Sequence, residues 1–206
     1  MKTRKISLLI AAAGLAVLAG CFGSTPPARF YALTSLEQAP TGPGAKSGFA
    51  DIAVGVGPVK IADYLDRSDI VTRGTGNTVK FAEFDQWAGS FEDGFTSALA
   101  ENLGSLLRSE QIYAHPWPQK VPVKYRVALE VIRFDGSLGG EAILIARWSV
   151  SGEEPDKPIA VERSSIQEPT GGRGYEDLVA AESRALGKLS REIAEVILTR
   201  EKDPNS

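Results

Sequence analysis

The sequence predicts an α+β fold: a mainly antiparallel sheet with two long helices packed on one face, forming a single domain. Two segments, near residues 87–107 and after residue 174, carry apolar residues three or four positions apart, the spacing of one helix face. Between them, three segments of alternating polarity follow one another across turn sequences, as in an antiparallel meander. Neither a repeat nor a linker divides the chain, so one body over residues 29–200 is expected.

Several short strands are expected before the first helix. Phe30–Leu33 predicts the first of them, and a flexible loop rich in Pro, Gly and Ala follows over Glu37–Gly48. Asp51–Ile61 alternates in polarity, and its Gly57-Pro58 step predicts a bulge or break because proline lacks a backbone donor. A hairpin is expected where Gly74-Thr75-Gly76-Asn77 separates Ile70–Arg73 from Thr78–Phe81.

Asp85 is the expected N-cap of the first helix, whose apolar stripe runs from Trp87 to about Leu107. The segment that follows, Ser109–Pro122, holds three prolines and is expected to be a loop.

The meander is expected to use Val123–Val131 and Ile159–Gln167 as alternating outer strands. Ala142–Trp148 is apolar on both faces apart from Arg147, which predicts a central strand covered on both sides. The first turn is expected at Asp135–Gly140. The second helix is expected after Gly171–Gly174, and residues 201–206 are expected to be a polar tail.

The first twenty residues have the form of a secretory signal peptide. A basic head, Met1–Lys5, precedes the apolar run Ile6–Gly20, which is shorter than the ~20 residues that a membrane-spanning helix needs. The run ends in Leu18-Ala19-Gly20-Cys21, which matches the lipobox of bacterial lipoproteins. Cleavage after residue 20 and a lipid on Cys21 are therefore predicted.

Lipidation of Cys21 would consume the only cysteine, so no disulfide is expected within the chain. Several acyl chains hold a protein stably on a bilayer, whereas one chain does so only reversibly. Residues 21–28 contain Gly and Pro and are expected to form a lipidated tether. Phe22, rather than an aspartate that would signal inner-membrane retention, follows the cysteine. In a cell with two membranes, the expected location is the periplasmic face of the outer membrane.

Charge argues against nucleic acid as a partner. Loss of the signal removes three basic residues and leaves 20 basic and 26 acidic residues, a net charge of −6. Binding to phosphates requires clustered cations, which an acidic body does not favour.

The sequence offers neither a catalytic constellation nor a metal site. His115 is the only histidine and lies in a proline-stiffened loop, with no serine or aspartate positioned beside it to form a catalytic triad. One histidine and one lipidated cysteine are too few for zinc. Gly171–Gly174 could hold an anion at a helix start, but no P-loop lysine follows, so a loop-to-helix junction is favoured. An EF-hand loop needs a glycine and a distal glutamate, which are lacking around the expected surface acids Asp63, Asp66 and Asp69. We therefore expect no enzyme and no cofactor besides the covalent lipid.

One segment is distinctive: Val56–Arg67 reads VGPVKIADYLDR and continues into Ile70–Arg73. It resembles the signature of the ABC-type transport auxiliary lipoproteins, the PqiC or YmbA group. The resemblance extends over essentially the whole mature chain, through Arg29–Leu33, Trp87, Ala100–Leu103, Leu144–Trp148 and the helix from Tyr175.

The resemblance implies a non-enzymatic subunit of a lipid transport assembly in which MCE-type proteins bridge the envelope. The lipoprotein would dock their outer-membrane end, and the setting is compatible with a homo-oligomer. Tyr64, Leu65, Asp66 and Arg67 are our candidates for contact with a partner or second subunit, because Tyr and Arg are favoured in interface cores. The alternative is a structural turn with Leu65 in the core and Arg67 paired to an acid.

Two other functions are compared with this adaptor. A stand-alone periplasmic lipoprotein that shelters a lipid or peptide would need a sizeable apolar cavity between helices and sheet. An envelope hydrolase would need a catalytic group that the sequence does not provide.

Overall fold

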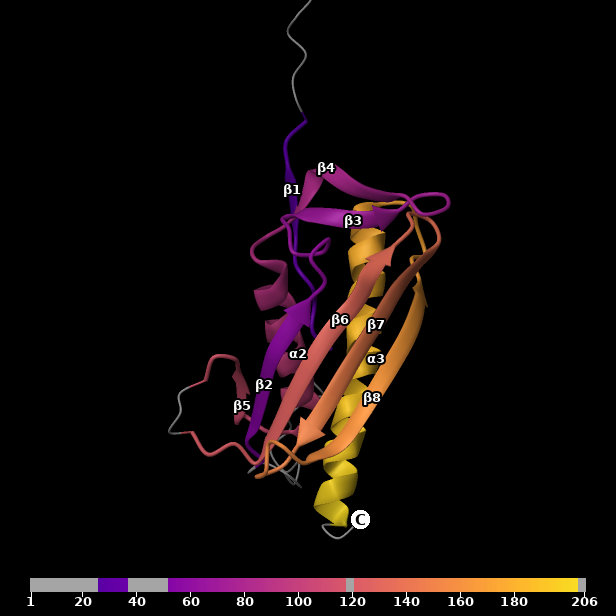
Figure 1. Ribbon diagram of the computed structural model, residues 1–206. Helices are drawn as coiled ribbons and strands as arrows, with labels where there is room; N and C mark the ends of the chain where they lie inside the picture. The colour runs from indigo at the N-terminus through magenta and orange to yellow at the C-terminus, as the bar shows by residue number, and fades with distance from the viewer. Residues whose placement is uncertain (1–25, 37–51, 118–120, 204–206) are drawn as a thin grey trace, which may run out of the picture.

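The computed structural model describes residues 26–36, 52–117 and 121–203. The expected signal peptide, the lipid site Cys21 and the loop Glu37–Gly48 lie outside these ranges. The described chain forms one domain, a curled sheet backed by two helices (Figure 1). In chain order the elements are β1 (Arg29–Tyr31), β2 (Val54–Ile61), β3 (Asp69–Arg73), β4 (Val79–Trp87), α2 (Phe91–Leu107), β5 (Ile112–Ala114), β6 (Tyr125–Gly136), β7 (Glu141–Ser151), β8 (Pro158–Pro169) and α3 (Tyr175–Lys202).

The sheet is mixed, so the expectation of a mainly antiparallel sheet is wrong. The meander β6-β7-β8 is antiparallel as predicted, and so is the hairpin β3-β4. Parallel pairs join β2 to β5 and β6, β1 to β4, and β3 to β6. These parallel partners are distant in sequence: the β3-β4 hairpin, α2 and β5 all lie between β2 and β6. Alternation within a strand predicts the strand but does not reveal a non-adjacent parallel partner.

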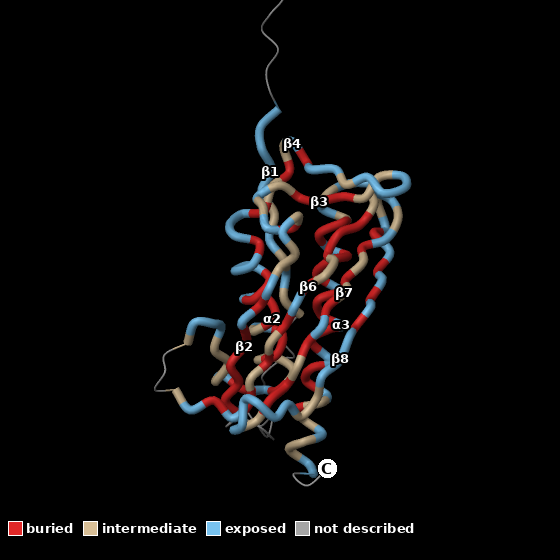
Figure 2. Tube along the Cα trace, viewed as in Figure 1, coloured by how far each residue is buried: buried red, intermediate tan, exposed pale blue. Residues whose placement is uncertain are grey.

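Both long helices cover the same face of the sheet, as the sequence predicts (Figure 1). α3 packs on β6, β7 and β8, and α2 packs on β2, β5 and α3. Burial is concentrated between these layers, where the tube of Figure 2 is red. At one end of this core, Phe134 of β6 contacts Phe91 and Phe95 of α2, with ring centroids 5.5 Å and 5.4 Å apart.

The first helix begins later than predicted, and Asp85 is not its N-cap. β4 continues through Asp85 to Trp87, and α2 begins at Phe91. Ser90 is the N-cap, and its Oγ accepts a hydrogen bond from the Asp93 N–H at 3.3 Å. The expected end at Leu107 is confirmed. Trp87 belongs to β4, but it lies four positions before Phe91 and therefore fits the apolar spacing of α2. For this reason the periodicity of apolar residues placed the start of the helix about one turn too early.

A β-bulge changes which residues of β6 face the core. Up to Val131 the odd-numbered residues are buried, but the register with β7 shifts between Val131 and Arg133. Phe134 and Asp135 are then both buried, so Asp135 belongs to the strand and not to the predicted turn. A bulge adds one residue to one strand and redirects the side chains that follow it.

Three smaller expectations also need correction. The segment Ser109–Pro122, predicted to be a loop, contains β5. β7 buries one face against α3, whereas Ile143 and Ile145 on its other face are only partly buried, so it is not covered on both sides. α3 continues through Glu201 to Lys202, two residues into the segment expected to be a polar tail.

Candidate functional site at the signature turn and the N-terminal attachment

The signature residues 62–68 form a tight connection from β2 to β3, which we call the signature turn. The Leu65 N–H donates to the Ala62 carbonyl at 2.8 Å, and the Leu65 side chain is buried in the core. Asp66 is exposed. The Arg67 guanidinium lies 3.5 Å from the centroid of Phe81, and Arg67 Nε is 3.5 Å from Asp69 Oδ2. The structure thus gives Leu65 and Arg67 the contacts that a structural turn requires, and it leaves Asp66 and the Arg67–Phe81 pair at the surface.

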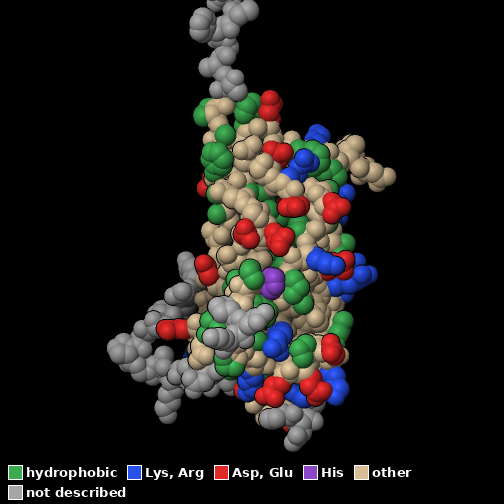
Figure 3. Space-filling view, turned by 60° about the vertical axis from the view of Figure 1, so that its left-hand side comes forward, with side chains coloured by type: hydrophobic (Ala, Val, Ile, Leu, Met, Phe, Trp, Pro, Cys, Tyr) green, Lys and Arg blue, Asp and Glu red, His purple; other side chains and the backbone are tan. Residues whose placement is uncertain are grey.

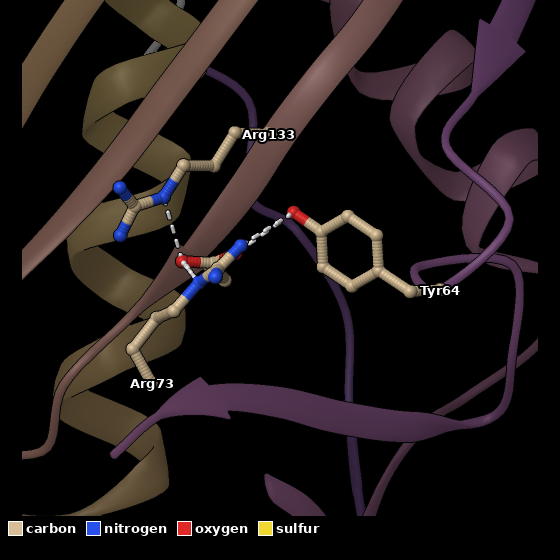
Figure 4. Close-up of polar contacts among 4 residues, drawn as sticks. Tyr64, Arg73 and Arg133 are labelled. Carbon is tan, nitrogen blue, oxygen red and sulfur yellow. Dashed lines mark hydrogen bonds and ion pairs between the residues drawn. The ribbon is translucent and has the colours of Figure 1, made fainter. Parts of the chain in front are cut away.

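Tyr64 points inward, to a carboxylate that the sequence analysis did not single out. Its hydroxyl donates to Asp135 Oδ2 at 2.8 Å (Figure 4). Arg73 Nη2 lies 3.0 Å from the same oxygen, and Arg133 Nε lies 2.9 Å from Asp135 Oδ1. The Asp135 side chain is fully buried. A buried carboxylate is tolerated when cations and hydrogen-bond donors surround it, and two guanidinium groups and a phenol do so here.

The ionisation of this cluster follows from its burial. Burial, followed by the hydrogen bond to Asp135, raises the pKa of Tyr64 to about 12. The hydrogen bond to Asp135 also raises the pKa of Arg73. Tyr64 is therefore a neutral donor and Arg73 a permanent cation at any physiological pH. The cluster connects the signature turn, β3 and β6 through buried polar contacts.

A second acid, Glu182 of α3, is buried close to this cluster. Burial first, and then the charge of Asp135, raise the pKa of Glu182 well above its ordinary value. Its Oε2 has no hydrogen-bond partner among the described residues. A carboxyl in such surroundings is favoured in its neutral form, because burial removes water from the ionised form and the charge of Asp135 repels it.

The N-terminal strand is fastened to β4 by Asp85, the residue expected to cap a helix. Arg29 makes a bidentate contact with Asp85, with Nε–Oδ1 at 2.8 Å and Nη2–Oδ2 at 2.9 Å. The Tyr31 hydroxyl donates to Asp85 Oδ1 at 2.7 Å. Burial and this hydrogen bond raise the pKa of Tyr31 to about 12. Asp85 thus holds the first described strand at two points.

Beyond β1, residues 32–36 lie against both helices. The Thr34 N–H donates to Ser183 Oγ at 3.1 Å, and the Leu36 N–H donates to Asn102 Oδ1 at 2.6 Å. Gly187 of α3 leaves room for Leu36, because a Cβ at position 187 would lie 2.8 Å from Leu36 Cδ2. We call Arg29–Leu36 the N-terminal strap. It joins the start of the described chain to β4, α2 and α3.

His115 is exposed. Figure 3 shows the histidine at the open surface beside hydrophobic side chains. Its backbone N–H donates to the Val56 carbonyl at 2.8 Å, and its ring meets Trp117 edge-on, with centroids 5.6 Å apart. The loop packs closely on β2, where a Cβ on Gly55 would lie 2.8 Å from Trp117 Cη2.

At the Gly171–Gly174 junction, a carboxylate of the chain itself binds the backbone just before α3. Asp177 Oδ2 accepts the Gly174 N–H at 2.9 Å, in front of α3. This contact fits the loop-to-helix junction that the sequence favours. Within the described ranges there is no group of three or more His, Cys, Asp or Glu placed to hold a metal ion. Likewise, no helix in the described parts of the chain combines the length and apolarity needed to cross a bilayer.

The sequence matches one family over most of its length. The match covers residues 31–194 and is to the ABC-type transport auxiliary lipoprotein component family. The chain belongs to this family, which confirms the resemblance drawn from the signature. It is thus a lipoprotein auxiliary component of a transport system, from a family that is not a known enzyme family and has no known cofactor.

Solved structures share the fold at low sequence identity. Protein XCC0632 from Xanthomonas campestris is 17% identical, with a TM-score of 0.69 over 87% of this chain and 100% of that one. An uncharacterized protein, also 17% identical, gives a TM-score of 0.68 over 84% of this chain and 99% of that one. No curated protein matches the sequence.

Proposed function

We propose that the chain is cleaved after residue 20, is lipidated on Cys21, and acts at the outer membrane as the docking component of an MCE/ABC-type lipid transport system. The observation that carries the proposal is the N-terminal strap. A lipid anchor holds a folded body in place only when the chain behind the lipid is fixed to that body. Arg29, Thr34 and Leu36 provide such fixation, through Asp85, Ser183 and Asn102.

The position of the strap also supports an orientation of the domain relative to the bilayer. The first described residues lie at the end of the molecule that carries β3 and β4, opposite the C-terminal end of α3 (Figure 1). Pro26 lies five positions after Cys21, a span of at most ~18 Å. On a lipid anchor, the β3-β4 end would therefore face the bilayer, and the end with β5 and the last turn of α3 would point into the periplasm.

Within the signature turn, we propose that Asp66 and Arg67 contact the partner, and that Tyr64 and Leu65 hold the turn in the shape that presents them. The first pair lies at the surface, beside the half-exposed Phe81. The second pair is fixed by the Asp135 cluster and by the core. Arginine and aromatic side chains that stand together at a surface, as Arg67 and Phe81 do, are frequent anchors of protein interfaces.

Lipidation is tested by growing cells that express the full chain with a radioactive fatty acid. The parent should be labelled and sediment with the outer membrane, whereas a Cys21→Ser variant should be unlabelled and uncleaved. A Phe22→Asp variant should remain labelled but move to the inner membrane. Unlabelled parent protein would refute the anchor.

Docking is tested by purifying the tagged parent from membranes and probing for an MCE-type protein of the same cell. An Asp66→Lys/Arg67→Glu double variant should lose this protein, while a Glu153→Lys/Lys157→Glu variant, altered in the exposed turn between β7 and β8, should retain it. Equal recovery of the MCE-type protein with both variants would show that the signature turn is not part of the interface.

One observation favours the second candidate, a stand-alone carrier of lipid or peptide. A groove of about 430 Å³ lies between the N-terminal strap and α2, within the 300–1,000 Å³ typical of ligand sites. Native mass spectrometry of the protein from its membrane would separate the two functions. Lipid bound to a monomer favours the carrier, whereas self-association or an MCE partner favours the docking component.

A further inference from the structure

The groove beside the N-terminal strap has an apolar lining. It separates Tyr31 and Leu33 of the strap from the first turns of α2. Its floor is formed by the buried side chains of Trp87, Phe91, Phe95 and Ala98. The rings of Trp87 and Phe91 pack against each other in a tilted arrangement, with centroids 5.1 Å apart and 36° between their planes.

The rim of the groove is acidic. Asp93 and Glu101 of α2 both line it and are both exposed, and neither Lys nor Arg is among the lining residues. Neither carboxylate has a cationic partner within the described part of the chain. The two acids lie eight positions apart on one helix, about 12 Å along its axis, and Phe95 and Ala98 of the floor lie between them in the sequence.

We propose that this groove binds an amphipathic helix of a partner protein, with apolar side chains on the aromatic floor and Lys or Arg side chains against Asp93 and Glu101. Helices commonly bind in this way, with anchors spaced three and four residues apart entering an apolar groove. The acidic rim disfavours a fatty acid or an anionic lipid as the ligand, because its negative charge would be repelled by the two carboxylates. The inference rests on the proposed function and names the chemistry of the docked partner.

Gly94 provides a way to obstruct the groove without disturbing the fold. It lines the groove, and a Cβ at this position would meet no atom within 4 Å. A longer side chain there would extend over the groove while α2 stays intact, since residues other than glycine favour the helix. Gly94→Gln is therefore an obstructing variant, and Gly94→Ala is its matched control.

The test uses the full lipoprotein in nanodiscs of zwitterionic lipid and a fluorescent peptide of Leu and Lys, about 18 residues or ~27 Å of helix. Fluorescence anisotropy should show saturable binding to the parent and to Gly94→Ala. The Asp93→Asn/Glu101→Gln variant should bind about five-fold more weakly, because two exposed ion pairs are lost. Glu153→Gln/Asp156→Asn, which removes two exposed acids elsewhere, should bind like the parent.

The other outcomes overturn the proposal. Equal peptide binding by the parent and Gly94→Gln would mean that the groove is not the site. Binding of oleate in place of the peptide, unchanged in Asp93→Asn/Glu101→Gln, would assign the groove to a lipid chain. Fatty-acid labelling and recovery of the MCE-type protein test the proposed function separately. A negative result for peptide binding in the groove therefore does not change the outcome of those two tests.

Discussion

Asn102 joins the N-terminal strap to both helices. Its Oδ1 accepts the Leu36 N–H at 2.6 Å, and its Nδ2 donates to Ser190 Oγ at 3.0 Å. The residue is fully buried on α2, and Ser190 is fully buried on α3. One amide therefore connects a backbone segment and two helices that are distant in sequence. The strap is part of the folded body and not an appendage to it.

Asn102→Ala should destabilise the protein by about 1–3 kcal/mol, because the Leu36 N–H and Ser190 Oγ lose their partner within the core. Urea denaturation followed by circular dichroism measures the change. Ser97→Ala, an exposed change on the same helix, is the control and should shift the free energy of unfolding by less than about 0.5 kcal/mol. A loss of the same small size in Asn102→Ala would show that the strap is not held by this amide.

Gly187 and Leu36 form a pair whose coupling can be measured. Gly187→Ala alone forces Leu36 to move, because the new Cβ would lie 2.8 Å from Leu36 Cδ2. In a Leu36→Ala background that conflict disappears, and Gly187→Ala should then stabilise α3 by about 0.5–1 kcal/mol. A double-mutant cycle of unfolding free energies should thus show coupling. Additive effects would place Leu36 away from Gly187 in solution.

Glu182 should make stability fall as the pH rises. Its pKa is raised in the folded state, so above pH ~4.5 the carboxyl ionises first in the unfolded state and lowers the free energy of that state, while the folded state stays protonated. The loss continues until the pH passes the raised folded-state pKa. Unfolding free energies of the parent and Glu182→Gln, measured from pH 4 to pH 8, should differ in slope over this range. Parallel curves would show that Glu182 does not titrate abnormally.

Asp135→Asn should be strongly destabilising, by about 3 kcal/mol, because it leaves the cations of Arg73 and Arg133 facing a neutral group in the core. Tyr64→Phe removes one neutral hydrogen bond and should cost only about 1 kcal/mol. Thermal and urea unfolding give both values. If Tyr64→Phe cost as much as Asp135→Asn, the phenol and not the ion pairs would hold the cluster together.

The same cluster predicts a spectroscopic change. The pKa of Tyr64 is about 12, raised by burial and by its bond to Asp135. In Asp135→Asn, the tyrosine absorbance titration at alkaline pH should gain a group that ionises closer to pH 10. Tyr64→Phe/Asp135→Asn serves as the control and should lack that group. A titration unchanged from the parent would contradict the hydrogen bond.

Local patterns identified much of the fold. The Gly74–Asn77 hairpin, the break at Gly57-Pro58, the meander and the start of α3 after Gly174 are all confirmed. Each depends on residues close in sequence, where turn chemistry and the periodicity of apolar residues act. For the same reason the two acids at the centre of the site were not recognised. Asp85 looked like an N-cap and Asp135 like a turn residue. Asp85 is directed inward because β4 continues through it, and Asp135 is directed inward by the β-bulge in β6.

By itself, the sequence determined the class of fold, the two helices, the expected lipid site at Cys21 and the family, because these are carried by neighbouring residues and a distinctive signature. The tertiary structure decided which strands pair in parallel, which acids are buried, and where the N-terminal segment lies. These depend on contacts such as Leu36–Asn102 and Tyr64–Asp135, between residues more than sixty positions apart. The free energy of such contacts comes from burial and hydrogen bonding that exist only once the chain has folded.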